Sequence, residues 1–313
     1  MTDETIYWAH IAAVEGMGGA IFDELLKRFG SVKRALEAPI DEVREIPSMD
    51  GRTAEAICRA GQTLKATDAK IAALAKVGVR VVTKLDPHYP PKLRQAYNPP
   101  PVLYIAGELL PEDDRAVAII GSRDCTLISA RRARDYAQHL ASNGWSIVSG
   151  YAAGIDLNAH LGALRAGGRT IIIPGCGAER FDFAPLAEVG IRSFPDLARR
   201  GVWISEQPPA ADWSGKTSLG RNRLVAAQAC AVIVIEARLN SSTMDTAARA
   251  QSLKRPLFVQ AFATLSQRFM GNELLRREGA AEIQETEDLD RLLESLRRDS
   301  TRKPTPRPDD PRR

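Results

Sequence analysis

The stretch WSIVSGYAAGID, residues 145–156, places an apolar run directly before a turn that contains glycine. Trp145–Val148 is typical of a strand that is buried on both faces of a sheet. Ser149–Asp156 contains two glycines, which permit a tight turn from a strand into a helix. A helical pattern over Ala159–Ala166 follows and ends at Gly167-Gly168, a helix-stop signal. The stretch therefore predicts a strand, a turn and a helix in succession.

The same unit recurs along the chain after residue 115. Ser129–Ser142, for example, is a helical stretch that ends at Gly144. The apolar runs that predict buried strands are Val117–Ile120, Trp145–Val148, Thr170–Ile173, Val202–Ile204, Ala231–Ile235 and Leu257–Val259. Strands that alternate with helices indicate a parallel, doubly wound sheet. We therefore expect an α/β fold whose core, residues 115–285, is a Rossmann-like and mainly parallel sheet.

Residues 1–75 are predicted to form a small helical domain, of the kind seen in SAM and helix-hairpin-helix units. Its turn Val14–Gly18 contains two glycines, and glycines in such a hairpin let backbone amides approach a phosphate. A second turn, Ile46–Asp50, has Ser48 and Asp50 at those positions, and the Asp50 carboxylate would repel a phosphate. A plain helical bundle is therefore the simpler interpretation of this region.

Two further segments flank the core. Residues 76–114 are predicted to be a connector with two strands, Val79–Val82 and Val102–Gly107, separated by prolines that exclude helix. Residues 286–313 are predicted to contain a short helix, Leu289–Leu296, and a disordered basic tail. The tail sequence TRKPTPRPDDPRR is too polar and too rich in proline to fold alone.

The net charge of +4 is concentrated at the end of the chain. Arg297–Arg313 contains seven basic and three acidic residues, so the rest of the chain is neutral, and any binding of nucleic acid by the body must depend on a local cluster. No apolar stretch approaches the roughly 18–20 residues of a membrane helix, and MTDETIYWAH lacks the pattern of a secretory signal. Four cysteines and four histidines are scattered. We expect a cytoplasmic protein with no membrane contact, metal or cofactor.

Glycines, hydroxyls and an arginine follow the predicted strands at the points where they end. The residues in question are Gly121-Ser122-Arg123, Ser149–Asp156, Pro174–Gly177, Ser205-Glu206, and Glu236 with Asn240–Thr243. Because α/β sheets bind ligands at the carboxyl ends of their strands, we expect these loops to converge on one site. Backbone amides and hydroxyls suit phosphate. One such loop is explained equally well by turn geometry, but several on one edge favour binding.

A second source of positive charge lies before the fifth core strand. Arg221-Asn222-Arg223 is predicted to open a helix over Leu224–Cys230, and Lys216 stands shortly before it. Guanidinium groups bind phosphate in a bidentate manner and stack on bases. Such clusters are often only a solvated face, but the predicted position beside the glycine-rich edge favours binding.

In order along the chain, these motifs resemble the signature of the DNA-processing protein A (DprA/Smf) family. The motifs are Gly121-Ser122-Arg123, SGYAAGID with Ala159-His160, Arg221-Asn222-Arg223 and the strand Val232–Glu236, followed by Thr246-Ala247, Gly271-Asn272 and Gly279-Ala280. The similarity spans roughly residues 10–282. It implies a protein without catalytic activity that binds and protects incoming single-stranded DNA, dimerises, and loads the RecA recombinase during natural transformation.

The resemblance also implies roles for individual residues. The predicted DNA-binding set is Gly121, Ser122, Arg123, Ser149, Gly150, Gly154, Lys216, Arg221, Asn222 and Arg223, in which the arginines contact phosphate and the glycines and serines shape the pocket. Asp156 and His160 are predicted to brace the loop rather than to touch DNA.

The chain departs from the family pattern in four places. Ser218-Leu219-Gly220 stands where the family has Phe-Pro before the arginine motif, which removes an aromatic ring that could stack on a base. Ser241-Ser242-Thr243 replaces a Ser-Gly-Ser turn, and Val259–Phe262 lacks an expected Pro-Gly. No winged-helix sequence follows the core. These differences predict a divergent member and leave its mode of DNA binding open.

Several other functions compete with this one. Ser214–Thr217 resembles the end of a P-loop, but Ala210 replaces the required glycine and no strand directly precedes it. The core also resembles nucleoside-monophosphate glycosidases of the lysine-decarboxylase-like (LOG) group, whose catalytic glutamate is replaced here by Arg249. Asp245 lies nearby, so this activity remains an alternative. A non-catalytic sensor that binds a small nucleotide on the same edge is another. Dinucleotide binding is weaker, since no GxGxxG motif opens the first core helix.

Overall fold

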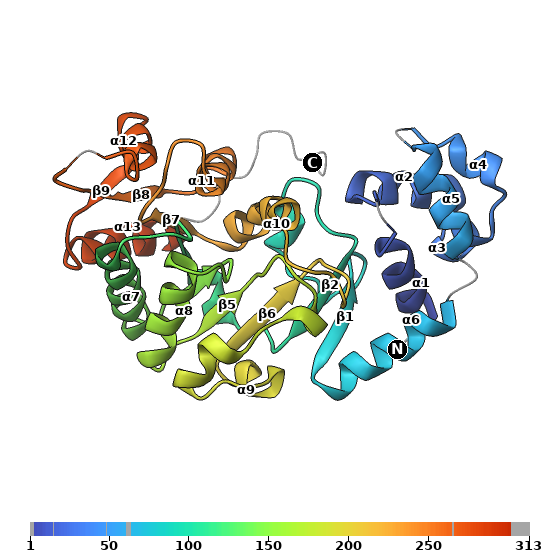
Figure 1. Cartoon of the computed structure of the whole chain (residues 1–313), viewed down its shortest axis with the longest axis horizontal. Coiled ribbons are helices and arrows are strands. Elements are labelled where there is room, and N and C mark those ends of the chain that lie inside the picture. Colours follow the sequence, from blue (N-terminus) through green and yellow to red (C-terminus); the bar gives the residue numbers. More distant parts are fainter. Residues whose placement is uncertain (1–2, 15, 48, 61–63, 265, 302–313) are drawn as a thin grey trace.

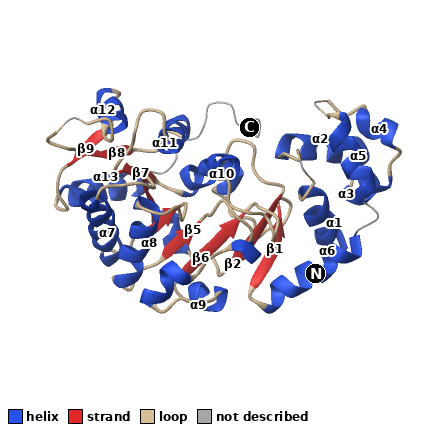
Figure 2. Cartoon of the chain, in the orientation of Figure 1, coloured by secondary structure: helices blue, strands red, loops and turns tan. Residues whose placement is uncertain are grey.

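The computed structural model describes residues 3–301 except 15, 48, 61–63 and 265. Among these described residues, six α-helices come first, and the part that follows them forms one sheet with helices on both faces (Figures 1 and 2). The basic tail from residue 302 onward lies outside the described residues. In the described part of the chain, no helix is both long enough and apolar enough to cross a membrane.

The N-terminal helices pack on one end of the sheet. They are α1 (Asp3–Ala12), α2 (Gly19–Phe29), α3 (Val32–Glu37), α4 (Ile40–Arg44), α5 (Gly51–Ala60) and α6 (Leu64–Lys76). Trp8 and Phe22 lie at the centre of this bundle, with ring centroids 4.5 Å apart. The same apolar cluster continues through Val79 and Tyr104 to Trp203 of the sheet, so the bundle and the sheet share a core.

The glycine hairpin before α2 is packed against protein. A Cβ at Gly16 would approach the Thr53 hydroxyl to 2.5 Å, and a Cβ at Gly19 would lie 2.6 Å from the Pro99 carbonyl oxygen. The second turn is a helix cap, because Asp50 Oδ1 accepts a hydrogen bond from Thr53 N (2.7 Å). Glu15 and Ser48 lie outside the described residues. Packing therefore explains both turns, and the phosphate-binding hypothesis for this region finds no support in their geometry.

The sheet has nine strands in the order β1-β2-β6-β5-β4-β3-β7-β8-β9. The strands are β1 (Val79–Thr83), β2 (Val102–Ala106), β3 (Ala116–Ile120), β4 (Ser146–Ser149), β5 (Thr170–Ile172), β6 (Gly201–Ser205), β7 (Ala231–Val234), β8 (Leu257–Gln260) and β9 (Ala281–Ile283). The pairs β1–β2 and β2–β6 are antiparallel, and all the others are parallel. The predicted Rossmann-like, mainly parallel fold is confirmed, and the connector supplies two of its strands.

The order in which strands are added to the sheet reverses between β3 and β7, which are themselves parallel. From β3 the chain builds β4, β5 and β6 on one side, then crosses over to build β7, β8 and β9 on the other. Open α/β sheets bind ligands in the crevice at such a reversal, beyond the carboxyl ends of the strands. The fold therefore directs attention to the loops that follow β3 and β7.

Helices cover both faces of the sheet. They are α7 (Leu127–Ser142), α8 (Ile155–Arg165), α9 (Phe194–Ala198), α10 (Gly215–Gln228), α11 (Ser242–Ser252), α12 (Met270–Arg277) and α13 (Asp288–Thr301), and short 3₁₀ helices cover Leu93–Gln95, Pro111–Arg115, Ala178–Arg180 and Ala184–Val189. In β3, Val117 and Ile119 pack against α7, α8 and α13, whereas Ala116 and Ala118 face α10 and α11. This alternation explains why the core strands read as unbroken apolar runs.

The start of α10 corrects a predicted boundary. The helix begins at Gly215, not near Leu224, because Ser214 and Thr217 cap it reciprocally. Ser214 Oγ accepts from Thr217 N (3.0 Å), and Ser214 N donates to Thr217 Oγ1 (3.0 Å). Arg221-Asn222-Arg223 therefore lies in the middle of α10 instead of opening a helix.

Candidate functional site

A pocket of about 440 Å³ lies at the carboxyl ends of β3 and β7. Loops after β3, β4 and β7 line it, together with the first turns of α10 and α11. Six of the ten predicted DNA-binding residues line this pocket, and they are Gly121, Ser122, Arg123, Gly150, Arg221 and Asn222. The loops after β3, β4 and β7 thus converge as expected at the reversal point of the sheet, whereas Pro174–Gly177 and Ser205-Glu206, which were expected there too, do not line the pocket.

A larger cavity of about 640 Å³ lies near the ends of β8 and β9. Its two arginines are both neutralised: Arg132 pairs with Glu285, and Arg276 pairs with Glu273 and Glu282. Among the described residues that line it, this cavity therefore offers an anion no unpaired positive charge, and we assign the candidate site to the smaller pocket.

Arg221 forms the buried floor of the pocket. Its guanidinium lies against the backbone of Gly150, where a Cβ would overlap it, and its Nη1 donates to the carbonyl of Ile173. Only 3% of the residue is exposed. Burial lowers the pKa of Arg221 to about 10, and the charge of Asp156 opposes this shift. Arg221 is therefore still a cation at neutral pH.

Asp156 holds the glycine-rich loop and faces Arg221. Its Oδ2 accepts hydrogen bonds from the backbone amides of Gly150 (3.2 Å) and Ala152 (3.4 Å). Burial raises the pKa of Asp156, while Arg221 and these amides favour the carboxylate. The contacts of Asp156 are thus those of a residue that braces the loop, although it also lines the pocket.

Arg123 projects from the loop between β3 and α7. It is exposed, and it makes no salt bridge or side-chain hydrogen bond with any described residue. Its charge lowers the pKa of Arg221, so the two guanidinium groups repel each other across the pocket. An anion that enters between them would relieve this repulsion.

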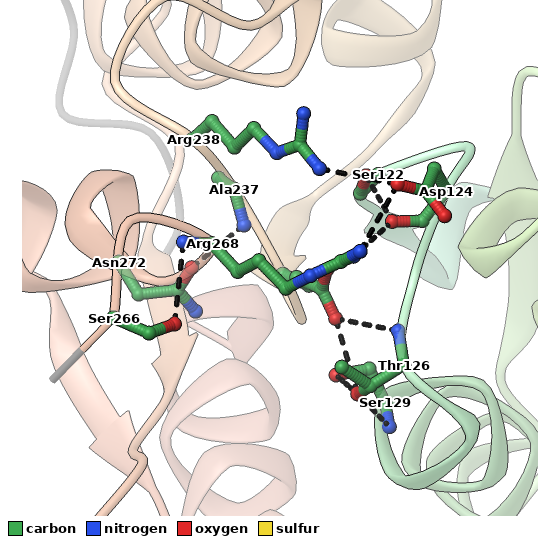
Figure 3. A network of polar contacts seen from close by, with 10 residues as sticks. Ser122, Asp124, Thr126, Ser129, Ala237, Arg238, Ser266, Arg268 and Asn272 are labelled. Carbon is green, nitrogen blue, oxygen red and sulfur yellow. Dashed lines mark hydrogen bonds and ion pairs between the residues drawn. The ribbon is translucent and has the colours of Figure 1, made fainter. Parts of the chain in front are cut away.

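A polar network anchors the loop that carries Arg123 (Figure 3). Ser122 N donates to the carbonyl oxygen of Glu236 (2.8 Å), and Thr126 N donates to its carboxylate (2.9 Å). Glu236 is fully buried at the end of β7. Arg238 and Arg268 come from the segments after β7 and β8 and reach Asp124 in this loop, at 3.1 Å each. Arg123 is therefore presented from a fixed backbone.

Four members of the predicted DNA-binding set lie outside the pocket lining. Ser149 is fully buried and donates from Oγ to the carbonyl of Ile119 (2.6 Å), which ties β4 to β3. Gly154 has φ +82° and packs on the Ser122 carbonyl, so it couples the two loops. Lys216 lies exposed on the first turn of α10. Ser149 and Gly154 therefore shape the pocket from behind.

Arg223 is the clearest correction. Residues two apart on a helix point about 200° apart, so Arg221 and Arg223 cannot face the same pocket. Arg223 instead pairs with Glu206 (2.6 Å) and donates to the carbonyl of Tyr97 (2.9 Å). Its donors are thus used within the protein, and it joins α10 to the segment before β2.

The start of α11 was expected at this edge of the sheet, whereas two arginines were missed as possible ligand contacts. Ser241, Ser242 and Thr243 bring the N-terminus of α11 to the pocket, and helix N-termini favour anions. Arg238 also lines the pocket; it follows β7 as Arg123 follows β3, so the strand-end rule could have found it. Arg268 comes from the segment after β8, and no local sequence signal marks it.

His160 is a structural residue that lies behind the pocket. It is fully buried, and its Nδ1 lies 2.7 Å from Thr170 Oγ1, which donates to the Ile147 carbonyl (3.1 Å). Nδ1 therefore carries the proton. Burial lowers the pKa of His160 to about 3, and the charge of Arg221 adds to this effect. The side chain is neutral at physiological pH.

This neutral histidine predicts a loss of stability in acid. The unfolded chain takes up a proton near pH 6.5, whereas folded His160 takes one up only near pH 3. Stability present above pH 6.5 is therefore lost as the pH falls, by about 1.4 kcal/mol per unit. Between pH 7.0 and 5.5, we expect wild type to lose about 1 kcal/mol more unfolding free energy than His160→Gln in urea titrations. Equal losses in both proteins would show that His160 titrates normally.

The fold and the pocket define the class of this chain: a Rossmann-like α/β protein with glycine loops and two cations at the reversal point of its sheet. The family model of DNA recombination-mediator protein A matches residues 80–294, and the chain belongs to this family. The predicted family membership is thus confirmed.

Three relatives illustrate the similarity. The Smf protein of Synechocystis sp. is 30% identical over 259 residues, which cover 82% of this chain and 64% of that protein. The chain therefore spans less than two thirds of the length of this curated relative. DNA processing protein A from Streptococcus pneumoniae superposes with a TM-score of 0.72 at 26% identity, covering 92% of this chain and 97% of that one. DNA processing protein A from Helicobacter pylori, described for its single-stranded DNA binding mode, superposes with a TM-score of 0.59 at 30% identity. The superposition covers 69% of this chain and 96% of that one.

Proposed function

We propose that this chain binds single-stranded DNA in the pocket between β3 and β7. The observation that carries the proposal is the pair Arg123 and Arg221, two guanidinium groups on one pocket that make no salt bridge with a described residue. The N-terminus of α11 adds backbone amides at the same place. Phosphate is the anion that this combination suits, and the single-stranded DNA binding described for the Helicobacter pylori relative supports a DNA strand as its source.

The wider role follows from the family and is part of the proposal. We infer that the protein works in the cytoplasm as a homodimer, protects incoming single strands, and loads the RecA recombinase during natural transformation. Fluorescence anisotropy with a labelled oligonucleotide tests the first step, with duplex DNA and nucleoside monophosphates as competitors. Single-stranded DNA should bind most tightly, and the affinity should fall as salt rises because phosphate binding releases counterions. A preference for mononucleotides would instead indicate a nucleotide sensor.

We expect Arg123→Ala to weaken DNA binding by about 1–3 kcal/mol, the range for a lost charge-assisted contact. The melting temperature should not change, because Arg123 is exposed and makes no contact that the fold requires. Arg199→Ala is a matched control, since Arg199 is 70% exposed and lies just before β6, at the amino ends of the strands.

The basic tail supplies a second control. A chain shortened after Thr301 should still bind DNA and should still lose affinity with Arg123→Ala. If only the full chain binds, the tail accounts for the binding and the pocket assignment is wrong.

We further propose that the pocket performs no catalysis. Arg249 stands where a glycosidase glutamate would be, and it pairs with Asp245 at 2.8 Å. Asp245 Oδ2 also accepts from Asn222 (3.3 Å), so its carboxylate is engaged within the protein. Incubation with nucleoside monophosphates should release no free base. Release that disappears in Asp245→Ala would overturn this proposal.

A further inference from the structure

A single carboxylate at the rim of the pocket is shared by two arginines. Asp124 Oδ2 lies 3.1 Å from Arg238 Nη2 and 3.1 Å from Arg268 Nη2. Figure 3 shows the two guanidinium groups reaching Asp124 from separate segments, one after β7 and one after β8. Asp124 is 74% exposed and Arg238 is 52% exposed, so solvent reaches this group of charges. Asp124 and Arg238 both line the pocket.

The carboxylate of Asp124 is not needed to hold its loop. The loop is anchored through Glu236, which accepts from Ser122 N and Thr126 N. Asp124 also contributes its backbone oxygen, which accepts from Arg268 Nη1 (2.6 Å) and Ser122 Oγ (3.0 Å). These bonds remain when the side-chain charge is removed. The exposed ion pairs of Asp124 therefore add little to stability, since such pairs contribute about 0–1 kcal/mol.

We propose that Asp124 is an internal counter-anion that competes with DNA phosphate for Arg238 and Arg268. These two arginines then extend the phosphate-binding surface beyond Arg123 and Arg221, and a phosphate takes the place of the Asp124 carboxylate between them. A phosphate offers more acceptor oxygens and binds guanidinium groups in a bidentate manner, which favours the exchange. This inference rests on the proposed binding of single-stranded DNA.

The test is Asp124→Asn in the full chain, measured by anisotropy with a labelled oligothymidylate over a range of salt concentrations. We expect affinity to increase about threefold to tenfold at low salt. The slope of log K against log salt should steepen by roughly 0.7 for each additional phosphate contact. Most of the gain should disappear in Asp124→Asn/Arg238→Gln, because Arg268 stays paired with Glu236 (3.3 Å) and bound to the Asp124 backbone oxygen. Weaker or unchanged binding by Asp124→Asn, or a gain that survives undiminished without Arg238, would overturn the inference.

A matched control separates this effect from a change in net charge. Glu188→Gln removes one negative charge from a pair with Arg165 (3.0 Å), near the C-terminal end of α8, and should leave affinity unchanged. An equal gain from Glu188→Gln would overturn the inference. If wild type binds and Arg123→Ala loses binding while Asp124→Asn gains nothing, only this inference fails. If wild type does not bind single-stranded DNA, the proposed function fails as well.

Discussion

Gly150→Ala is expected to weaken single-stranded DNA binding roughly 30–150-fold, which corresponds to about 2–3 kcal/mol. The new Cβ would overlap the guanidinium of Arg221, so the arginine must leave its position against the loop backbone. It would then lose its hydrogen bond to the Ile173 carbonyl and its alignment with Arg123. Stability should fall as well, because a buried guanidinium with an unsatisfied donor costs about 1–3 kcal/mol. Anisotropy and urea unfolding measure the two effects separately.

Gly220→Ala is the matched control for this change. Gly220 lies in α10, and a Cβ there would meet no atom within 4 Å. Alanine in a helix interior stabilises by roughly 0.5–1 kcal/mol relative to glycine, so the control should bind DNA normally and unfold at slightly higher urea. If Gly150→Ala also binds normally, Arg221 tolerates displacement and is not a DNA contact.

The arrangement of the core could be predicted from its sequence because its strands are buried on both faces. Unbroken apolar runs such as Val117–Ile120 and Ala231–Ile235, separated by helical stretches, predict a parallel sheet. The observed β3 and β7 lie within one residue of these limits. Parallel strands also determine which loops meet, and this is why Arg123 and Gly150 were correctly expected on one edge. β9 was missed, because only Ile283 of its three residues is buried.

The prediction failed where a local motif allowed two interpretations. Ser214–Thr217 was compared with a P-loop and rejected as one, but it was not recognised as the capping box of α10. The error in the start of the helix carried over to Arg223, which was expected beside Arg221. Once the helix is known to begin at Gly215, its period of 3.6 residues per turn is enough to show that the side chains of Arg221 and Arg223 point in different directions.

Other features could not be predicted because they depend on contacts between distant segments. Asp124 and Arg268 are 144 residues apart in sequence, and Arg223 and Tyr97 are 126 apart. No periodicity or spacing connects such pairs. For the same reason, the sequence could not distinguish the arginines that remain unpaired, such as Arg123, from those already engaged within the protein.

Asp156→Ala is expected to lower the unfolding free energy by about 3–5 kcal/mol, the cost of leaving the buried charge of Arg221 without a nearby opposite charge. Asp156 makes the largest charge contribution that favours protonated Arg221, and it also holds the amides of Gly150 and Ala152. Urea unfolding at pH 7 measures the effect. The variant should also bind DNA poorly, because the loop that seats Arg221 loses its acceptor.

The double variant Asp156→Ala/Arg221→Met distinguishes the two roles of Asp156. Suppose that the uncompensated charge of Arg221 causes most of the stability lost in Asp156→Ala. The double variant then contains no uncompensated buried charge, and methionine fills much of the space of the arginine. The double variant should then be at least about 2 kcal/mol more stable than the sum of the single losses predicts. Simple additivity would mean that Asp156 acts only through the loop amides. In either case the double variant should not bind DNA, since Arg221 supplies one of the two cations on which the proposed site depends.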